Sequence, residues 1–303
     1  MSTRPVLVTG ASGLLGAQVM LALREHASAV AVARRPEAAP REVAGADWRA
    51  ADLTETGVLG ALVRALAPRA IIHCAALANA AECEAQPERA SRVNAGLMGE
   101  LAAAGLAGGA RVVLVSTDLV FGAQKPPAAG FDEQHEPGPV SVYGASKRAG
   151  EERALEIGGD LVIARLPLLF GDSLGRGLGA TDSLHAALER GETPTLFDDE
   201  WRTPLAVEDA AAALVELALA REGARGLLHI AGPQRCTRLE LGLLALEARG
   251  MDPAEALAAV RAAPRASAGL APERPADCSL DAGRARSILT TSLRSPREAL
   301  RTA

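Results

Sequence analysis

The sequence is poor in aromatic residues and in lysine. Only 2% of its 303 residues are Phe, Trp or Tyr, and Tyr143 is the single tyrosine. The positive charge comes almost wholly from arginine, because Lys125 and Lys147 are the only lysines. So few rings argue against a surface that stacks bases or sugars on aromatic side chains. The same scarcity makes the remaining tyrosine and lysines informative.

Basic excess, paired cysteines and long apolar runs are also missing. Lys and Arg number 32 against 37 Asp and Glu, a net charge of −5 that argues against a nucleic-acid partner. Cys74, Cys83, Cys236 and Cys278 form no C-x-x-C pair, so we expect no metal site and no structural disulfide. No apolar run reaches the roughly 18 residues of a membrane helix, and Met1–Pro5 carries no secretory pattern. We therefore expect a cytoplasmic protein without a membrane partner; whether it forms a homodimer is left open.

Short apolar runs alternate with helical patterns through the first half of the chain. The apolar runs predict buried strands at Val6–Thr9, Ala29–Ala33, Ala70–His73, Arg111–Ser116 and Leu161–Leu166. The patterns between them predict helices at Leu14–Glu25, Gly57–Leu66, Pro87–Leu106 and Tyr143–Ile157. Strands that alternate with helices indicate βαβ units, so we predict an α/β fold with a doubly wound parallel sheet of the Rossmann type.

The pattern weakens after Phe170. A glycine-rich loop at Gly171–Gly179 precedes the remaining elements, which are helices near Thr181–Arg190, Ala206–Arg221 and Ala254–Arg261 and a strand at Leu227–Ala231. We expect a dinucleotide-binding domain at residues 1–168, with residues 204–232 packing back onto it. Residues 169–203 and 233–303 would form a smaller, less regular substrate-binding domain, with the ligand in the cleft between the two.

A glycine-rich segment, Thr9–Gly16, links the first strand to the first helix. Glycine at positions 10, 13 and 16 permits a tight turn and close approach to a pyrophosphate, which the free N–H groups of the helix would bind. The other interpretation is an ordinary strand-to-helix turn. We expect the dinucleotide to contact Gly10, Ser12, Gly13, Leu14, Leu15 and Gly16.

Two arginines follow the second strand where an acidic residue would favour NAD. Arg34 and Arg35 suit a ribose 2′-phosphate, so we expect NADP(H), with NAD(H) as the alternative. The competing interpretation is that both arginines are simply solvated. Asp52 and Leu53, after the next short strand, are placed to contact the adenine.

Tyr143 and Lys147 lie four residues apart at the start of a predicted helix and therefore share one face. A nearby ammonium lowers the pKa of a phenol from about 10 towards neutrality, as general-acid catalysis of carbonyl reduction requires. Y-x-x-x-K is common by chance, but here it joins the only tyrosine to one of two lysines. Thr117 and Asp118 end the fourth strand at the edge where such folds bind ligands, and Thr117 could hydrogen-bond a substrate oxygen.

The order and spacing of these motifs resemble the extended short-chain dehydrogenases/reductases, most closely the dTDP-4-dehydrorhamnose reductase-like, sugar-nucleotide-binding branch. The resemblance covers nearly the whole chain. It rests on Thr9–Gly16, Ile71–Ala76, Arg92–Asn94, Val115–Gly122, Ser141–Lys147, Arg165–Pro167, Trp201–Pro204, Val207–Asp209, Arg274-Pro275 and Ser279–Asp281.

The resemblance implies roles for individual residues. Tyr143 would be the proton donor, Lys147 would bind the nicotinamide ribose, and Thr117 would hold the substrate carbonyl oxygen. Asn94 would stabilise the active-site helix and a proton-relay water. Further implied contacts are with the cofactor at Cys74, Ala75, Ala76 and Pro167, and with the substrate at Thr117, Asp118 and Arg202, the last at its diphosphate.

The sequence departs from the family pattern at two places. Leu77–Ala81 lacks the polar residues that these reductases carry near the substrate, and Leu119 replaces the glutamate that assists elimination in dehydratase relatives. We expect NADPH-dependent reduction of a keto group on a nucleotide-activated sugar or related metabolite. Two alternatives remain: a non-catalytic NADP-binding regulatory subunit, like the β subunit of methionine adenosyltransferase, and an epimerase that retains NAD.

Overall fold

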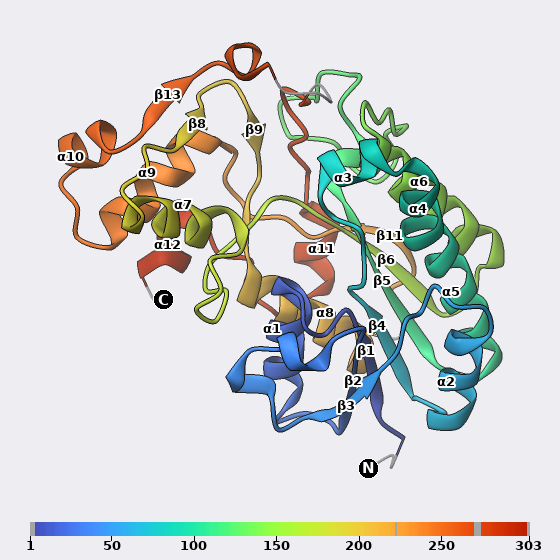
Figure 1. Ribbon diagram of the computed structural model, residues 1–303. Coiled ribbons are helices and arrows are strands. Elements are labelled where there is room, and N and C mark those ends of the chain that lie inside the picture. Colours follow the sequence, from blue (N-terminus) through green and yellow to red (C-terminus); the bar gives the residue numbers. More distant parts are fainter. Residues whose placement is uncertain (1–3, 222, 270–273, 302–303) are drawn as a thin grey trace.

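A seven-stranded parallel sheet forms the centre of the computed structural model, which describes residues 4–221, 223–269 and 274–301 (Figure 1). In sheet order the strands are β11 (Gly226–His229), β6 (Leu161–Leu166), β5 (Arg111–Thr117), β4 (Ala70–His73), β1 (Val6–Thr9), β2 (Ala29–Ala33) and β3 (Asp47–Ala50). All six neighbouring pairs run parallel. The predicted doubly wound α/β class is confirmed.

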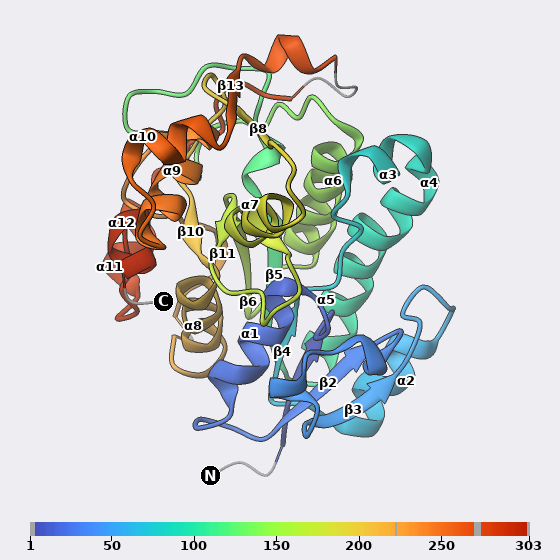
Figure 2. The ribbon, with the colours of Figure 1, turned by 60° about the vertical axis from the view of Figure 1, so that its left-hand side comes forward.

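Helices cover both faces of this sheet, as Figures 1 and 2 show. Helices α2 (Val58–Leu66), α5 (Leu97–Ala107) and α6 (Val142–Ile157) lie on one face, and α1 (Leu14–Leu23) and α8 (Val207–Leu219) lie side by side on the other. Neighbouring residues of a strand serve opposite faces, since Ile71 belongs to one apolar core and Ile72 to the other. Burial on both faces explains why these strands read as continuous apolar runs.

The strand order reverses at β1, where the site is built. β1 pairs with β2 on one side and with β4 on the other, so the chain winds outwards in both directions. Thr9, His73 and Thr117 end β1, β4 and β5 at the same carboxyl edge. A ligand of a doubly wound sheet binds in the crevice at this point.

A smaller region lies beyond the carboxyl edge of the sheet, at the upper left of Figure 1. Leu184, Leu196 and Leu246 contribute to an apolar core of its own. Its helices are α7 (Gly179–Glu189), α9 (Arg238–Ala248), α10 (Pro253–Ala258) and α12 (Pro296–Arg301). Its short strand pairs are β12 (Cys236–Thr237) with β9 (Trp201–Arg202) and β13 (Arg261–Ala263) with β8 (Thr195–Phe197). A third pair joins β10 (Leu205–Ala206) to β7 (Leu169–Phe170), and α11 (Gly283–Ile288) packs against β11.

Several element bounds differ from the predicted ones. The helix predicted at Pro87–Leu106 consists of α4 (Pro87–Ala90), a π-helical segment η3 (Ser91–Gly96) and α5. The helix predicted at Ala254–Arg261 ends at Ala258, because Arg261 begins a strand that pairs with β8. Helices α3 (Ala80–Ala85) and α9 were not predicted.

Residues 204–232 contribute α8 and β11 to the main sheet region. We keep the two-domain division as a proposal; its predicted ranges include residues 1–3, 222, 270–273 and 302–303, which lie outside the described residues. Within the described ranges, no helix combines the length and apolarity needed to cross a membrane.

Candidate active site

The turn between β1 and α1 packs tightly against the backbone that follows β4. Gly10 has φ +67°, and a Cβ there would stand only 2.5 Å from the amide nitrogen of Ala75, two residues after β4. Gly13 is the N-cap of α1, and its N–H donates to the carbonyl of Gly10 at 2.9 Å. Gly10, Ser12 and Gly13 line a cavity at this helix N-terminus, and such a glycine cradle suits a pyrophosphate, so the residues present fit a dinucleotide.

A cavity of about 570 Å³ runs along this carboxyl edge from the cradle. Its lining includes the predicted cofactor residues Gly10, Ser12, Gly13, Arg34, Arg35, Asp52, Leu53, Cys74, Ala75 and Ala76. Leu14, Leu15, Gly16, Tyr143, Lys147 and Pro167, also predicted to contact the cofactor, do not line it. Of these, Leu15 and Gly16 are buried within α1, and Pro167 is buried after β6.

One end of the cavity is strongly positive. Arg34 and Arg35 are exposed after β2, and Arg89 and Arg92, which the prediction missed, also line this end. Hydrogen bonds from Thr54, with the charges of Arg34 and Arg89, lower the pKa of the nearby Asp52 carboxyl. Arg89 pairs with Glu82 at 2.5 Å and Arg92 pairs with Glu100, so Arg34 and Arg35 are better placed to bind a phosphate. The sequence signal for Arg89 and Arg92 was their i, i+3 spacing, which places both on one helix face.

The end of β5 receives the two predicted catalytic side chains of α6. Ser141 caps this helix, its Oγ accepting from Gly144 N at 3.1 Å, which places Tyr143 in the first turn. The side chain of Thr117 lies close enough to the Tyr143 hydroxyl to act on its pKa, which it lowers against the effect of burial. The Lys147 Nζ donates to the carbonyl oxygen of Val115 at 2.6 Å. The structure therefore brings Tyr143, Lys147 and Thr117 together at the carboxyl edge.

The pKa values of Tyr143 and Lys147 differ from the expectation. Burial raises the pKa of the Tyr143 phenol above its ordinary value, and the charge of Asp118 raises it further. Burial also lowers the pKa of Lys147 to about 8. The expectation that Lys147 lowers the phenol pKa is wrong in this structure, because desolvation outweighs the other effects and the ammonium is held at Val115.

Asn94 links the π-helical segment to the active-site helix. Its Oδ1 accepts from Leu77 N at 2.8 Å, and its Nδ2 donates to Leu77 O at 3.1 Å and to Ser146 Oγ at 3.0 Å. Gly150 lets the two elements approach, since a Cβ there would lie 2.6 Å from Asn94 O. The amide thus fixes α6 against both η3 and the segment after β4.

Asp118 and Arg202 are buried against each other. Arg202 Nε lies 3.3 Å from Asp118 Oδ2, and its Nη1 donates to Trp201 O at 2.6 Å. Burial raises the pKa of Asp118 to about 6, although Arg202 opposes this rise. Arg202 is only 4% exposed, so these contacts favour a role inside the protein over the predicted diphosphate contact.

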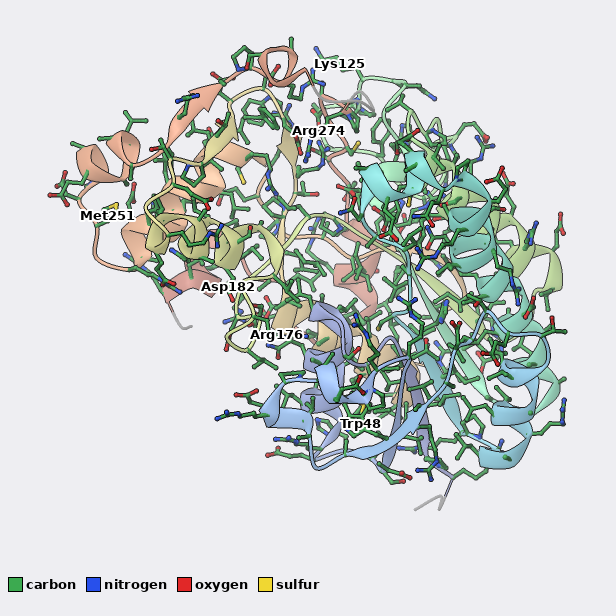
Figure 3. All side chains as sticks on the ribbon, in the orientation of Figure 1. Trp48, Lys125, Arg176, Asp182, Met251 and Arg274 are labelled. Atoms are coloured by element: carbon green, nitrogen blue, oxygen red, sulfur yellow. The ribbon has the colours of Figure 1, made fainter. Side chains whose placement is uncertain are left out.

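Two further arginines lie near the buried Glu200. Arg274 donates to both carboxylate oxygens of Glu200, at 2.8 and 3.1 Å, and is labelled near the top of Figure 3. The buried Nη1 of Arg238 has no hydrogen-bond partner among the described residues. Arg202 Nη2 also lies 3.4 Å from Glu200, so three arginines share this glutamate, while Asp118 and Asp277 also act on the charge of Arg202.

The chain as a whole is similar to known proteins. The model of the family described as RmlD substrate binding domain matches residues 3–303. The chain belongs to this RmlD family. The predicted membership of the extended short-chain dehydrogenases/reductases, a family of NAD(P)-dependent oxidoreductases, is thereby confirmed.

Three similar proteins illustrate the range of this family. A dTDP-4-dehydrorhamnose reductase from Bacillus anthracis, solved in complex with NADP, is 25% identical with a TM-score of 0.84, over 99% of this chain and 98% of that one. The probable low-salt glycan biosynthesis reductase Agl14 of Haloferax volcanii is 32% identical over 81% of this chain and 80% of its own. Methionine adenosyltransferase 2 subunit beta of Rattus norvegicus is 29% identical over 79% of this chain and 70% of its own.

In this RmlD-family chain, Arg176 joins the smaller region to the glycine turn, a contact that the sequence did not predict. Its Nη1 donates to Ser12 O at 2.5 Å and its Nη2 to Gly13 O at 3.3 Å. Its Nε donates to Ser173 O at 2.8 Å within the same loop, and Figure 3 shows Arg176 above the start of α1. The loop at 171–179 is thus tied to the turn that cradles the ligand.

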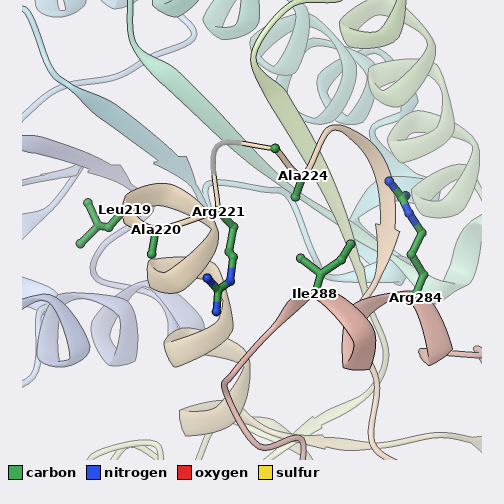
Figure 4. Close-up of a pocket in the computed structure, with 7 residues that line it drawn as sticks. Leu219, Ala220, Arg221, Ala224, Arg284 and Ile288 are labelled. Atoms are coloured by element: carbon green, nitrogen blue, oxygen red, sulfur yellow. The ribbon is translucent and has the colours of Figure 1, made fainter.

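A second cavity of about 450 Å³ lies away from this site of the RmlD fold (Figure 4). It sits where the end of α8 meets α11, and Leu219, Arg221, Arg284 and Ile288 are among its lining residues. None of the predicted site residues lines it. Nor do the described residues include a group of three His, Cys, Asp or Glu side chains that could hold a metal ion.

Proposed function

We propose that this protein catalyses the NADPH-dependent reduction of a keto group on a nucleotide-activated sugar or a related metabolite. The observation that carries the proposal is the convergence of Tyr143, Lys147 and Thr117 at the end of β5. The glycine cradle at the neighbouring strand β1 fits a dinucleotide. A phenol, an ammonium and a hydroxyl beside such a cradle suit carbonyl reduction.

The bound nicotinamide would supply the hydride that reduces the carbonyl carbon. Arg34 and Arg35 would bind a ribose 2′-phosphate, which favours NADP(H) over NAD(H). The relative from Bacillus anthracis was solved with NADP, in support of this preference.

Three side chains would take part in the transfer of a proton to the substrate oxygen. Thr117 and Tyr143 would both hydrogen-bond the substrate oxygen, which takes the Tyr143 proton as the carbon gains the hydride. The product is an alcohol, the phenolate left behind would regain its proton from solvent, and Lys147, one turn along α6, would bind the nicotinamide ribose. Asn94 would hold α6 in place through Ser146.

The substrate side of the site favours an anionic ligand. Arg238 and Arg274 lie near the carboxylate of Glu200, and the buried Nη1 of Arg238, which has no hydrogen-bond partner among the described residues, suits a diphosphate oxygen. We assign the direct phosphate contacts to Arg238 and Arg274, because Arg202 is engaged with Asp118. Asp118 then lies beside Thr117, at the sugar end.

A second candidate function is a cofactor-binding regulatory subunit without turnover. The likeness to methionine adenosyltransferase 2 subunit beta favours it, as does the apolar Leu77–Ala81 segment. We also keep a homodimer as a prediction, which analytical ultracentrifugation tests.

One experiment separates the two functions. Purified protein is given NADPH and a panel of nucleotide-linked ketosugars, and NADPH oxidation is followed at 340 nm. The proposed reductase consumes NADPH with at least one ketosugar and not with the matching alcohol. NADPH binding without consumption across the panel, together with capture of a partner protein, favours the regulatory subunit.

A further inference from the structure

Glu151 extends the pair of Tyr143 and Lys147 by one more turn of α6. The three residues are spaced by four and therefore share one helix face. Three consecutive residues of β5 receive them. Thr117 lies near the Tyr143 hydroxyl, the carbonyl of Val115 accepts from Lys147 at 2.6 Å, and Ser116 Oγ donates to Glu151 Oε1 at 2.5 Å.

The carboxylate of Glu151 is fixed by a fully buried arginine. Arg165 of β6 donates from Nη2 to Oε2 at 2.6 Å and from Nε to Oε1 at 2.9 Å, and the two side chains are 1% and 2% exposed. The remaining donor side of Arg165 meets His229 Nε2 at 3.2 Å, and the guanidinium lies over the ring of Phe121. A buried pair of this kind is weak evidence for stability, because desolvation offsets its attraction. Its place beside Lys147 calls for another explanation.

We propose that Glu151 is a positioning residue of the reaction, whose buried carboxylate, one turn along α6, keeps the Lys147 ammonium charged, while Ser116 and Arg165 fix that carboxylate. This inference rests on the proposed reductase function, in which Lys147 acts as a cation.

The surroundings of Lys147 support this role. Glu151 raises the pKa of Lys147 against the larger effect of burial, which lowers it to about 8. Just after β4, the half-buried Cys74 thiol has a pKa raised to about 12 by desolvation, and desolvation lowers that of His73 to about 3, so both are neutral near pH 7. Met98 of α5 offers only its thioether, 3.7 Å from Nζ. Tyr143 is neutral, so Glu151 is the carboxylate that acts on Lys147, while its pairing with Arg165 offsets part of its charge.

The test is the pH profile of kcat/KM for ketone reduction in Glu151→Gln. Loss of the charge lowers the pKa of Lys147, so the basic limb of the profile moves down by about one pH unit. At pH 8.5 the variant is then about tenfold below wild type, and at pH 6 the two agree within about threefold. Glu151→Asp, which keeps the charge, restores most of the limb.

Two further variants control for structural damage. Glu152→Gln removes the neighbouring ion pair with Arg148, in which Glu152 is exposed. We expect the basic limb of its pH profile to stay at the wild-type position. If Glu151→Gln alone does not fold, Glu151→Gln with Arg165→Met removes the whole pair, a replacement that proteins often tolerate. The limb of this double variant also moves down.

The outcomes separate this inference from the proposed function. If wild type reduces a ketone but the basic limb of the pH profile does not move in Glu151→Gln or in the double variant, the role of Glu151 is overturned and the reductase function stands. A wild type that reduces no ketone overturns the reductase function. In that case the pH dependence of NADPH affinity is compared between wild type and Glu151→Gln by nucleotide fluorescence. A basic limb that moves down in the variant supports the role of Glu151, and one that does not move rejects it.

Discussion

The proposed proton donor is a buried phenol with a raised pKa. Tyr143 keeps its proton at neutral pH because burial and the nearby Asp118 both disfavour the phenolate. Negative charge that develops on a substrate oxygen would then be the driving force for transfer. The sequence allowed the pairing of Tyr143 with Lys147 to be predicted, because it depends only on helical spacing. The direction of the phenol pKa could not be predicted, since it depends on residues packed from other elements.

Cofactor preference is a testable property of the arginines after β2. Replacing Arg34 and Arg35 together by Ala removes two of the four guanidinium groups at the positive end of the cavity. We expect NADPH affinity to fall by roughly 10- to 100-fold, the cost of one or two charge-assisted contacts, with NADH affinity unchanged. Isothermal titration with both nucleotides measures this, with Arg64→Ala on the exposed face of α2 as the control. Equal loss for NADPH and NADH would contradict a 2′-phosphate site.

At the scale of elements, the site depends on how α6 is held between β5 and η3. Long periodic segments were predicted well, and β1, β2, β4 and β6 have their predicted bounds. The π-helical turn at Asn94 was not predicted, because it arises from packing against Gly150 and Leu77. The strands of the smaller region are only two or three residues long, which is too short for an alternation of apolar and polar residues to be recognised in the sequence.

The loop at 171–179 offers a test at this scale. Arg176→Ala removes the bonds to Ser12 and Gly13, so the turn between β1 and α1 loses a support from the smaller region. We expect NADPH affinity to weaken about 5- to 20-fold, the effect of losing one or two hydrogen bonds from a charged group. Fluorescence titration measures the affinity. Arg190→Ala serves as the matched control, because its partner Glu192 lies in an exposed ion pair outside the site. Affinity unchanged in Arg176→Ala would contradict the coupling.

At the scale of the whole molecule, α8 is joined to the C-terminal segment by carboxylates. Glu216 accepts hydrogen bonds from both the N–H and the hydroxyl of Thr290 and Thr291, and Asp209 pairs with Arg294 at 2.6 Å. These contacts hold the end of the chain against a helix of the main sheet region. They were not predicted, because 74 or more residues separate the partners.

Glu216 also predicts a pH dependence of stability. Burial raises the pKa of this carboxyl, but the hydrogen bonds from the two threonines outweigh it and lower the pKa to about 2. A depressed carboxyl pKa stabilises the fold above the unfolded value near 4.5 and loses this contribution as the pH falls towards 2. We expect Glu216→Gln to cost about 2 kcal/mol at pH 7 and much less at pH 3. Urea unfolding at both values measures it, and an equal cost at both would contradict the ionic origin.

The central claim is that Tyr143 gives its proton to a substrate carbonyl. The most direct measurement compares NADPH oxidation by wild type and Tyr143→Phe, with the nucleotide-linked ketosugar that wild type reduces best. Phe keeps the ring and its packing but removes the hydroxyl. We predict a fall in kcat of roughly 10²- to 10⁴-fold, the usual contribution of a positioned general acid, with NADPH affinity unchanged. A Tyr143→Phe variant that binds NADPH and turns over at a rate near wild type would contradict the account.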